Sequence, residues 1–415
     1  MPELLAPGPG LDTRLLERFD WDRDGAPLVL ANPEWVKRYP AAAEEARRLL
    51  PDLPGHVFVA TSGTSRGVDA GLRWVALSRR ALLASAEAVN RHLGARPGDT
   101  WAHALPLFHV GGLGILVRAW LSGARVEDAA GGDWDPGRFH RRARASGATL
   151  TALVPAQLHD LVSAGLRAPA SLRAAVIGGG RLDPELHLSA RALGWPCLAS
   201  YGLTETASQI ATAPLASLEH SSCPRALPLL AHAEARVEDE GLISVRASSL
   251  LSCYVEIEDG QARRWDPRGA DGWFTTEDLG AMHARGLEVR GRQTETVKVL
   301  GELVWLPRVE ASAARWAARE PALARRRVDL AVAALPHARL GHELVLAIAL
   351  DPGPQPSVAV LAESLRRFEE DTALPFERVR RVAAVESIPR TPLGKCRRAL
   401  LASLLVGPEG PRDAS

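Results

Sequence analysis

In the first half of the chain, short apolar runs alternate with longer amphipathic segments, a pattern that is typical of βα units. Short apolar runs are separated by longer segments whose apolar residues recur every three to four positions. The short runs predict strands at 57–61, 101–105, 149–154, 174–177 and 197–201. The longer segments predict helices at 79–92, 114–121, 155–164 and 184–193, the first capped by Ser78. We expect parallel strands in a doubly wound α/β sheet with helices on both faces.

The pattern changes in the second half of the chain. Between 237 and 290 helical periodicity fades, and short runs predict strands at 242–245, 254–257, 273–276 and 288–290, in a small barrel or antiparallel sheet. After 291, strands near 296–300, 330–335 and 344–349 and helices near 308–319 and 358–370 indicate a separate α+β unit. We therefore expect an N-terminal domain of residues 1–291, whose β-rich part covers about 215–291, and a C-terminal domain of residues 292–415.

Composition and charge narrow the functional classes. The chain has 415 residues, of which 46% are hydrophobic, and its 50 basic and 49 acidic residues leave a net charge of +1. This balance argues against non-specific nucleic-acid binding and favours small-molecule partners. The four cysteines form no CxxC pair, so neither a zinc site nor a disulfide framework is indicated.

Nothing in the sequence indicates export or a membrane span. Charged residues interrupt the first thirty positions, and the longest apolar stretch, 105–117, is shorter than the roughly 20 residues that a bilayer requires. We expect a cytoplasmic protein. The sequence does not decide between a monomer and a homodimer.

The first candidate site is the stretch Thr-Ser-Gly-Thr-Ser-Arg-Gly at 61–67, which follows a predicted strand. Hydroxyl groups and backbone N–H groups in such a turn can surround phosphate oxygens without net charge. The stretch lacks the G-x-x-x-x-G-K-[ST] pattern of P-loop NTPases. The alternative from the residues alone is a plain turn.

The second candidate is Tyr-Gly-Leu-Thr-Glu-Thr-Ala-Ser at 201–208, at the carboxyl end of another predicted strand. Ligands of open α/β sheets collect at this edge. The aromatic ring of Tyr201 could stack on a base, and the carboxylate of Glu205 could hold Mg²⁺. The alternative is a helix N-terminus with Thr204 as its cap.

Taken together, these motifs resemble the acyl-adenylating superfamily, which contains acyl-CoA synthetases, luciferases and the adenylation domains of peptide synthetases. The stretch 61–65 is similar to its phosphate loop, 201–205 matches Y-G-x-T-E, and 276–280 is similar to the T-G-D motif. Gly291-Arg292 opens the hinge motif, and 389–395 matches the C-terminal P-x-x-x-x-G-K. Each motif alone is weak, but all of them occur here in the family's order.

Within the superfamily, the chain is most similar to the o-succinylbenzoate-CoA ligases of menaquinone biosynthesis. The resemblance rests on the stretches 105–112, 154–158, 177–180 and 201–209. It implies a large N-terminal αβαβα domain with a small β-rich subdomain, and a small mobile C-terminal α+β domain. The reaction that it implies joins o-succinylbenzoate to ATP as an acyl-adenylate, after which coenzyme A displaces AMP.

The resemblance assigns an ATP site with magnesium. The residues that it places around the nucleotide and its Mg²⁺ are Thr61, Ser62, Gly63, Thr64 and Thr204 at the phosphates, Gly178, Gly179, Gly180, Tyr201 and Gly202 at the adenine side, Asp278 at the ribose, Arg292 at the ribose or a phosphate, and Glu205 at the metal. Relatives carry Pro-Lys-Gly at the end of the phosphate loop. None follows Thr64 here, and Arg73 falls at the lysine position.

Lys395 is the residue that the resemblance makes catalytic in the first step, together with Thr204 and Glu205. A carboxylate that attacks the α-phosphorus of ATP meets like-charge repulsion, and a lysine that touches both groups offsets it. The resemblance places His109, Ser208 and Lys298 on the side of the acyl substrate and coenzyme A. The alternatives are another acyl-CoA or acyl-carrier ligase, or a non-catalytic ATP-binding relative.

Overall fold

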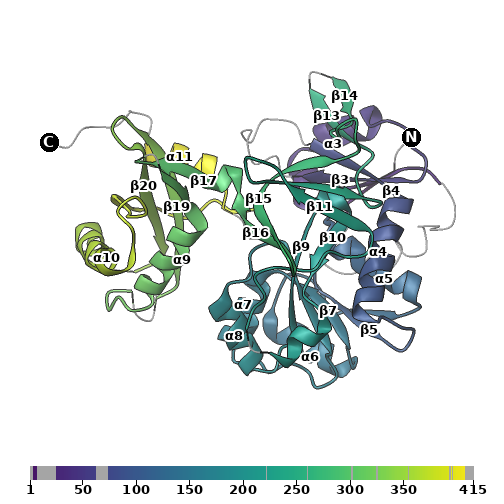
Figure 1. Cartoon of the computed structure of the whole chain (residues 1–415), viewed down its shortest axis with the longest axis horizontal. Coiled ribbons are helices and arrows are strands. Elements are labelled where there is room, and N and C mark those ends of the chain that lie inside the picture. Colours follow the sequence, from purple (N-terminus) through teal and green to yellow (C-terminus); the bar gives the residue numbers. More distant parts are fainter. Residues whose placement is uncertain are drawn as a thin grey trace. The chain divides into compact units, whose positions relative to one another are not determined.

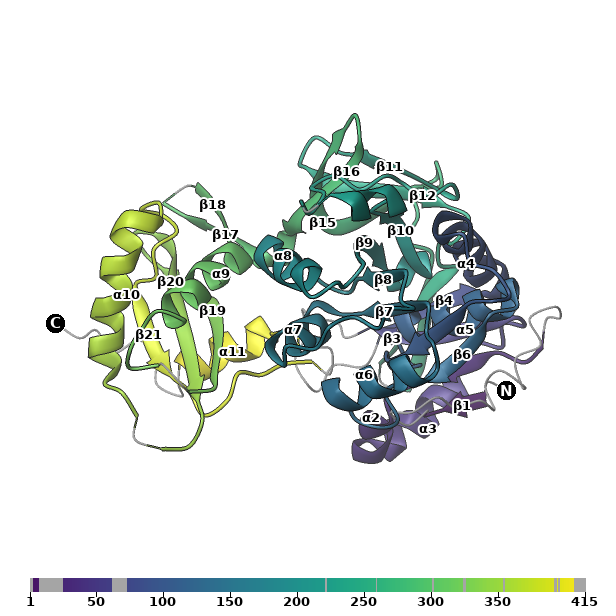
Figure 2. The ribbon, with the colours of Figure 1, turned by 90° about the horizontal axis from the view of Figure 1, so that it is seen from below.

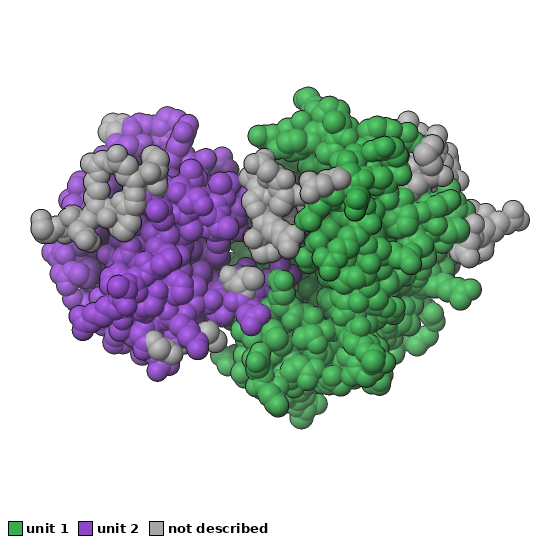
Figure 3. Space-filling view, turned by 90° about the horizontal axis from the view of Figure 1, so that it is seen from above, with its two compact units in different colours: residues 1–63, 70–290 green, residues 64–69, 291–415 purple. Residues whose placement is uncertain are grey.

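The computed structural model describes residues 3–6, 25–61, 73–220, 222–258, 260–300, 302–323, 326–353, 355–391, 394 and 396–406. These residues divide into two compact units (Figure 3): unit 1 extends to Arg290, and unit 2 begins at Gly291. Each unit is described by itself below.

The first sheet of unit 1 has six strands in the order β1-β2-β3-β4-β13-β14. They are β1 (Glu3–Leu5), β2 (Leu28–Leu30), β3 (His56–Thr61), β4 (Arg73–Ser78), β13 (Cys253–Glu258) and β14 (Gln261–Trp265). β3 pairs parallel with β2, as predicted, but it pairs antiparallel with β4 on its other side, where the prediction of parallel strands is wrong. The chain between β3 and β4 is too short for the crossover helix that a parallel pair needs.

The second sheet contains the other strands predicted in the first half of the chain. Its order is β10-β9-β8-β7-β5-β6. Its strands are β5 (Thr100–His103), β6 (Arg125–Asp128), β7 (Leu150–Leu153), β8 (Ala174–Ile177), β9 (Cys197–Leu203) and β10 (Ser208–Thr212). β5 to β9 pair parallel, as predicted, and only β10 runs antiparallel to its neighbour. Every residue of β5, β7 and β8 is buried, which explains their continuous apolar sequences.

Helices lie between these two sheets and on the outer face of each, so that sheets and helices together form five layers (Figures 1 and 2). They are α2 (Pro33–Arg38), α3 (Pro40–Leu49), α4 (Arg79–Leu93), α5 (Val110–Ser122), α6 (Pro136–Ala145), α7 (Pro155–Ser163) and α8 (Pro184–Ala192). α2 and α3 cover the outer face of the first sheet, and α6 to α8 cover the outer face of the second. α4 and α5 supply apolar residues to the inner faces of both sheets. This is the expected αβαβα arrangement, and the Ser78 hydroxyl caps α4 by accepting a 3.1 Å hydrogen bond from the Ala81 N–H.

A four-stranded sheet forms the rest of unit 1, in the order β11-β12-β15-β16. Its strands are β11 (Ala233–Val237), β12 (Leu242–Ala247), β15 (Phe274–His283) and β16 (Gly286–Arg292), and β12 is antiparallel to both neighbours. The predicted strand 254–257 does not belong here, because β13 pairs with β4 of the first sheet. The reason is burial: Val255 packs beside Trp74 on one face, and Tyr254 packs beside Val75 on the other.

Unit 2 is an α+β fold around a three-stranded sheet. Its elements are β17 (Thr296–Val299), β18 (Glu302–Trp305), α9 (Leu306–Ala317), β19 (Val328–His337), β20 (Gly341–Leu350), α10 (Val358–Thr372), β21 (Arg381–Ala384) and α11 (Arg398–Val406). α9 and α10 pack on one face of the sheet β19-β20-β21, and α11 packs on the other. The described residues also form three short 3-10 helices: η1 (Thr204–Thr206), η2 (Leu215–Glu219) and η3 (Gln293–Glu295). Among all the described helices, none has both the length and the apolar content for a bilayer span.

Candidate nucleotide and substrate site

The turn between β9 and β10 carries the central motif at 201–208. A side chain at Gly202 would place its Cβ 2.0 Å from the Ser208 carbonyl oxygen, so only glycine fits there. Thr206 closes the turn: its hydroxyl accepts from the Leu203 N–H at 2.9 Å and donates to the Ser208 carbonyl at 2.7 Å. Ala207 adopts a left-handed φ of 56°. A strained turn of this kind fixes the backbone of Thr204 and Glu205.

The motif at 201–208 does not form an ordinary helix N-terminus, which was the alternative. Residues Thr204–Thr206 make a single 3-10 turn whose N-cap is Leu203. Thr204 therefore does not cap a helix, and its hydroxyl is not used in that way.

Glu205 is held from two sides. Its backbone carbonyl accepts a 2.7 Å hydrogen bond from the Leu251 N–H, and its Oε1 accepts one of 2.8 Å from the Tyr254 hydroxyl. Tyr254 is 6% exposed, and burial raises the pKa of its phenol, as does the neighbouring carboxylate of Glu205. The phenol therefore stays protonated and donates its hydrogen.

The donor set around Glu205 fits Mg²⁺ only together with a nucleotide. Among the described residues no group of three or more His, Cys, Asp and Glu side chains could hold a metal ion. Mg²⁺ commonly takes one or two protein carboxylates and completes its shell with phosphate oxygens and water. A single, partly exposed Glu205 carboxylate matches that requirement.

Asp278 and Tyr201 meet at the edge of the second sheet. The Tyr201 hydroxyl donates a 2.8 Å hydrogen bond to Asp278 Oδ2. The Asp278 backbone N–H donates to the Thr276 hydroxyl at 3.0 Å, and Asp278 is only 4% exposed. Two motifs that lie far apart in the sequence are thus joined by one side-chain contact.

The glycines at 178–180 follow β8 directly. The Gly178 N–H donates to the Leu153 carbonyl at 3.0 Å, and a Cβ on Gly178 would lie 2.9 Å from the Ser200 hydroxyl. Gly179 has a left-handed φ of 74°. The chain therefore turns tightly at the carboxyl ends of β8 and β9, which is the ligand-binding edge of a parallel sheet.

Ser208 contacts a buried arginine that the sequence reasoning missed. Arg118 on α5 is 1% exposed, and its Nη2 donates a 2.8 Å hydrogen bond to the Ser208 hydroxyl. Burial lowers the pKa of Arg118 to about 10, so the guanidinium is still charged at neutral pH. Arg118 forms no ion pair with any carboxylate of the described residues, and its Nε has no partner among them. The signal that could have revealed it is its place as the one charged residue in the apolar sequence of α5.

His109 occupies the N-cap of the same helix, α5. Its side chain makes no capping hydrogen bond, and its ring lies 4.6 Å from the Phe108 ring. Burial lowers the pKa of His109 to about 4, and within the described chain its Nε2 has no hydrogen-bond partner. His109 is thus a neutral, apolar-facing ring at neutral pH.

Arg73 makes a different contact from the predicted one. Its Nε donates a 2.8 Å hydrogen bond to Glu256 Oε1, across the pair β4 and β13. Its guanidinium also lies 5.0 Å from the centroid of the Tyr254 ring. A role for Arg73 at the ATP phosphates stays a prediction.

The remaining predicted residues are outside unit 1 or outside the described residues. Arg292, at the end of β16, lies just past the boundary at Gly291 and so belongs to unit 2, as does Lys298, whose side chain is exposed on β17. The predicted contacts of Ser62, Gly63, Thr64 and Lys395, and of the Thr61 side chain, fall outside the part of the chain that is described.

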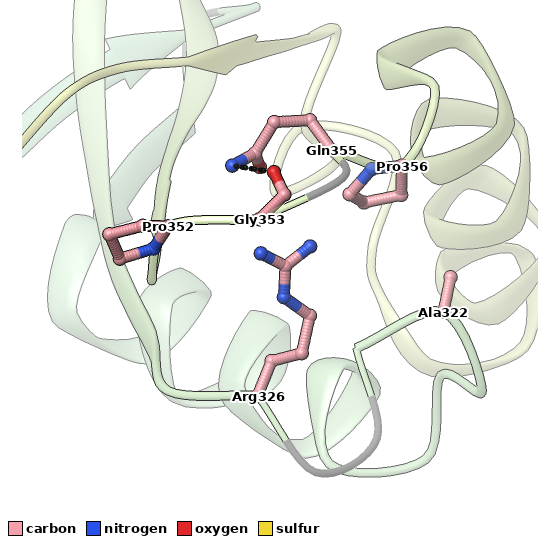
Figure 4. Close-up of a pocket in the computed structure, with 6 residues that line it drawn as sticks. All are labelled: Ala322, Arg326, Pro352, Gly353, Gln355 and Pro356. Atoms are coloured by element: carbon pink, nitrogen blue, oxygen red, sulfur yellow. Dashed lines mark hydrogen bonds between the residues drawn. The ribbon is translucent and has the colours of Figure 1, made fainter.

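A surface pocket of unit 2 is not part of the predicted site. Figure 4 shows it around the Arg326 guanidinium, between the loop at Gly353 and Gln355 and the segment at Ala322. Arg326 donates to Asp351 Oδ1 at 2.9 Å and to the Asp351 carbonyl at 2.7 Å. Its charge is therefore compensated within unit 2, and no predicted site residue lines this pocket.

The five-layer fold, the strained turn at 201–208 and the Glu205 carboxylate fit an adenylate-forming ligase, and the comparisons with known proteins assign the chain to that class. Residues 72–249 match the family model described as AMP-binding enzyme. A relative in Mycobacterium tuberculosis, named probable 2-succinylbenzoate–CoA ligase, is 32% identical over 360 residues, which cover 85% of this chain and 85% of the relative. The chain belongs to this family of AMP-binding enzymes and is an AMP-forming acid–thiol ligase.

Other similar proteins agree with this assignment. The 2-succinylbenzoate–CoA ligase of Bacillus cytotoxicus is 30% identical over 239 residues, 55% of this chain and 48% of that protein. The fold is shared with the o-succinylbenzoate CoA synthetase of Bacillus subtilis. Its complex with the acyl-adenylate OSB-AMP has a TM-score of 0.70 at 22% identity and covers 91% of this chain and 78% of that one. Its complex with ATP and magnesium ion has the same TM-score at 21% identity, with 91% and 84% covered.

Proposed function

We propose that this enzyme adenylates 2-succinylbenzoate with ATP and then transfers the acyl group to coenzyme A. The observation that carries the choice of acid is Arg118. Its guanidinium is buried on α5 with the Ser208 hydroxyl as side-chain partner, and no carboxylate of the described residues neutralises it. The names of the Mycobacterium and Bacillus relatives support the same acid.

A buried guanidinium without an anion is costly, because the desolvation of its charge is not offset. A substrate with two carboxylates would remove this cost. One carboxylate would react with the α-phosphorus of ATP, and the other would stay ionised against Arg118 and Ser208. The neutral ring of His109 and the apolar residues of α5 would face the carbon skeleton between the two charges.

The nucleotide would lie along the carboxyl ends of β8 and β9. Gly178, Gly179 and Gly180 would allow close approach of the adenine, with Tyr201 and Gly202 beside it, and Asp278 would accept hydrogen bonds from the ribose hydroxyls. Thr204, with Thr61, Ser62, Gly63 and Thr64 of the phosphate loop, would contact the phosphates.

Four residues complete the chemistry of this proposal. Glu205 would hold Mg²⁺, which would offset charge on the phosphates. Lys395 would stabilise the charge that develops between the attacking carboxylate and the α-phosphate. Lys298 would act on the coenzyme A side in the second step, and Arg292 would reach the ribose or a phosphate. A change in the orientation of residues 292–415 between the two steps, and a cytoplasmic location, are parts of the same proposal.

Replacement of Arg118 by methionine tests the choice of acid. We expect kcat/KM for 2-succinylbenzoate to fall about 100-fold or more, because the second carboxylate would be left buried and unpaired. Two analogues, each lacking one of the two carboxylates, serve as controls. The analogue that still reacts should be turned over by wild type and by Arg118→Met at rates within about 3-fold of each other. An equal loss for 2-succinylbenzoate and this analogue would contradict the proposal.

A further inference from the structure

Tyr254 contacts Glu205 from a distant part of the sequence, 49 positions away. It lies on β13, a strand of the first sheet, and is paired in register with Val75 of β4. Its hydroxyl is 2.8 Å from Glu205 Oε1. Among the described residues, no other side chain donates a hydrogen bond to the Glu205 carboxylate.

The ring of Tyr254 is held in place by its neighbours. The Trp265 ring, on the paired strand β14, lies 5.3 Å from the Tyr254 ring at an interplanar angle of 43°. The Arg73 guanidinium lies 5.0 Å from the Tyr254 ring centroid and 5.6 Å from that of Trp265. Arg73 is itself fixed by its 2.8 Å hydrogen bond to Glu256. A cation held against two aromatic faces restricts the rotation of both rings.

The backbone of Glu205 is fixed by the same segment of chain. The Leu251 N–H donates to the Glu205 carbonyl at 2.7 Å, three residues before Tyr254. The 251–254 segment therefore holds both the main chain and one carboxylate oxygen of Glu205. The second oxygen, Oε2, has no hydrogen-bond donor within the described part of the chain.

We propose that Tyr254 is a positioning residue for the magnesium carboxylate of Glu205. Its hydroxyl fixes Oε1, braced by Arg73 and Trp265, and so limits the carboxylate to the rotamer that can bind Mg²⁺ of the nucleotide. The inference rests on the proposed role of Glu205. Partners that orient a metal ligand commonly contribute a factor of about 10 to 100 in metal affinity.

The test is Tyr254→Phe, which removes the hydroxyl and keeps the ring. Mn²⁺ binding to the protein with a non-hydrolysable ATP analogue, measured by electron paramagnetic resonance, should weaken about 10-fold. The Mg²⁺ concentration for half-maximal pyrophosphate release should rise by a similar factor, and kcat at saturating Mg²⁺ should stay within about 3-fold of wild type. Tyr39→Phe, which alters a tyrosine at the start of α3, is the matched control and should change neither quantity.

Two further variants keep the test decisive. In a Glu205→Gln background Tyr254→Phe should add less than about 2-fold to the loss of Mn²⁺ affinity, because the two residues act as one unit. Glu256→Gln, which loosens Arg73 and leaves Tyr254 intact, should weaken Mn²⁺ binding in the same direction by a smaller factor. Unchanged Mn²⁺ affinity in Tyr254→Phe would overturn the inference, even if wild type releases pyrophosphate normally. Absence of pyrophosphate release by wild type would instead contradict the proposed function, and the Mn²⁺ measurement would still decide the role of Tyr254.

Discussion

The hydroxyl of Tyr201 donates a 2.8 Å hydrogen bond to Oδ2 of Asp278, which ties the end of β9 in the second sheet to β15 of the four-stranded sheet. The two residues come from different motifs of the sequence, 77 positions apart. Both would face the nucleoside half of ATP in the proposed function. The contact therefore couples the shape of the adenine side to the orientation of the ribose acceptor.

Substitutions of Tyr201 or Asp278 should weaken ATP binding and leave KM for the acid nearly unchanged. Asp278→Ala should weaken ATP binding about 10- to 100-fold, because a charged acceptor is lost, and Tyr201→Phe should weaken it about 5-fold through the loss of one orienting hydrogen bond. Calorimetric titration with ATP measures both effects. KM for the acid should change less than 2-fold, and a change in KM for the acid as large as that in ATP affinity would contradict the assignment.

Lys395 is expected to act in one half-reaction only. Lys395→Ala should slow acid-dependent ATP–pyrophosphate exchange about 100-fold or more, since a charged group aimed at the transition state is removed. Thioester formation from supplied acyl-adenylate should stay within about 3-fold of wild type. Lys37→Ala on α2 is the matched control and should leave both rates unchanged. Normal exchange in Lys395→Ala would show that another group stabilises the first transition state.

Gly202 should tolerate no side chain. The Cβ of Gly202→Ala would lie 2.0 Å from the Ser208 carbonyl oxygen, and this backbone atom cannot move without opening the turn that holds Glu205. We expect a loss of about 1–3 kcal/mol in the free energy of unfolding and loss of pyrophosphate release. Gly98→Ala, whose Cβ would meet no atom within 4 Å, serves as the control and should melt and react like wild type. Equal behaviour of the two variants in thermal melting would refute the steric argument.

Glu369 of unit 2 makes stability depend on pH. The side chain is 2% exposed, its two oxygens accept from the Val379 N–H at 3.2 and 3.0 Å, and burial raises the pKa of its carboxyl from 4.5 to about 7. Between these two pKa values the folded protein binds more protons than the unfolded chain, so the contribution of Glu369 to stability is present below pH 4.5 and is lost as the pH rises to about 7.

The variant Glu369→Gln should remove this dependence. As the pH rises from about 5 to about 8, the stability of the variant relative to wild type should increase by up to about 3 kcal/mol. This corresponds to the difference between the pKa of Glu369 in the unfolded chain and in the folded protein. Urea unfolding of both proteins at the two pH values measures the change. A stability difference that is the same at both pH values would contradict a raised pKa at Glu369.

Local patterns predicted most of the fold, because helices and buried strands depend on neighbouring residues. The predicted helix 79–92 forms as Arg79–Leu93 with Ser78 as its cap, and the strand 174–177 forms with the same bounds. Pairing between distant strands could not be predicted in this way. β13 leaves the β-rich sheet for β4 because Val255 and Tyr254 find their packing partners there, and no local pattern carries that information.

The residues of the candidate site also fall into two groups, those that a local motif predicts and those that only a tertiary contact reveals. Glu205, Tyr201 and Asp278 lie in contiguous motifs, and the sequence alone was enough to select them. Arg118 and Tyr254 lie in no such motif, because each gains its meaning from one contact across the fold, with Ser208 and with Glu205. Residues of this second kind can be found only once the tertiary contacts are known.

Pyrophosphate release with ATP, Mg²⁺ and 2-succinylbenzoate, measured with and without coenzyme A, tests the central claim most directly. We expect release of about one pyrophosphate per enzyme without coenzyme A, because the acyl-adenylate stays bound, and continuous turnover to the acyl thioester when coenzyme A is added. Absence of acid-dependent pyrophosphate release in both conditions would contradict the proposed function.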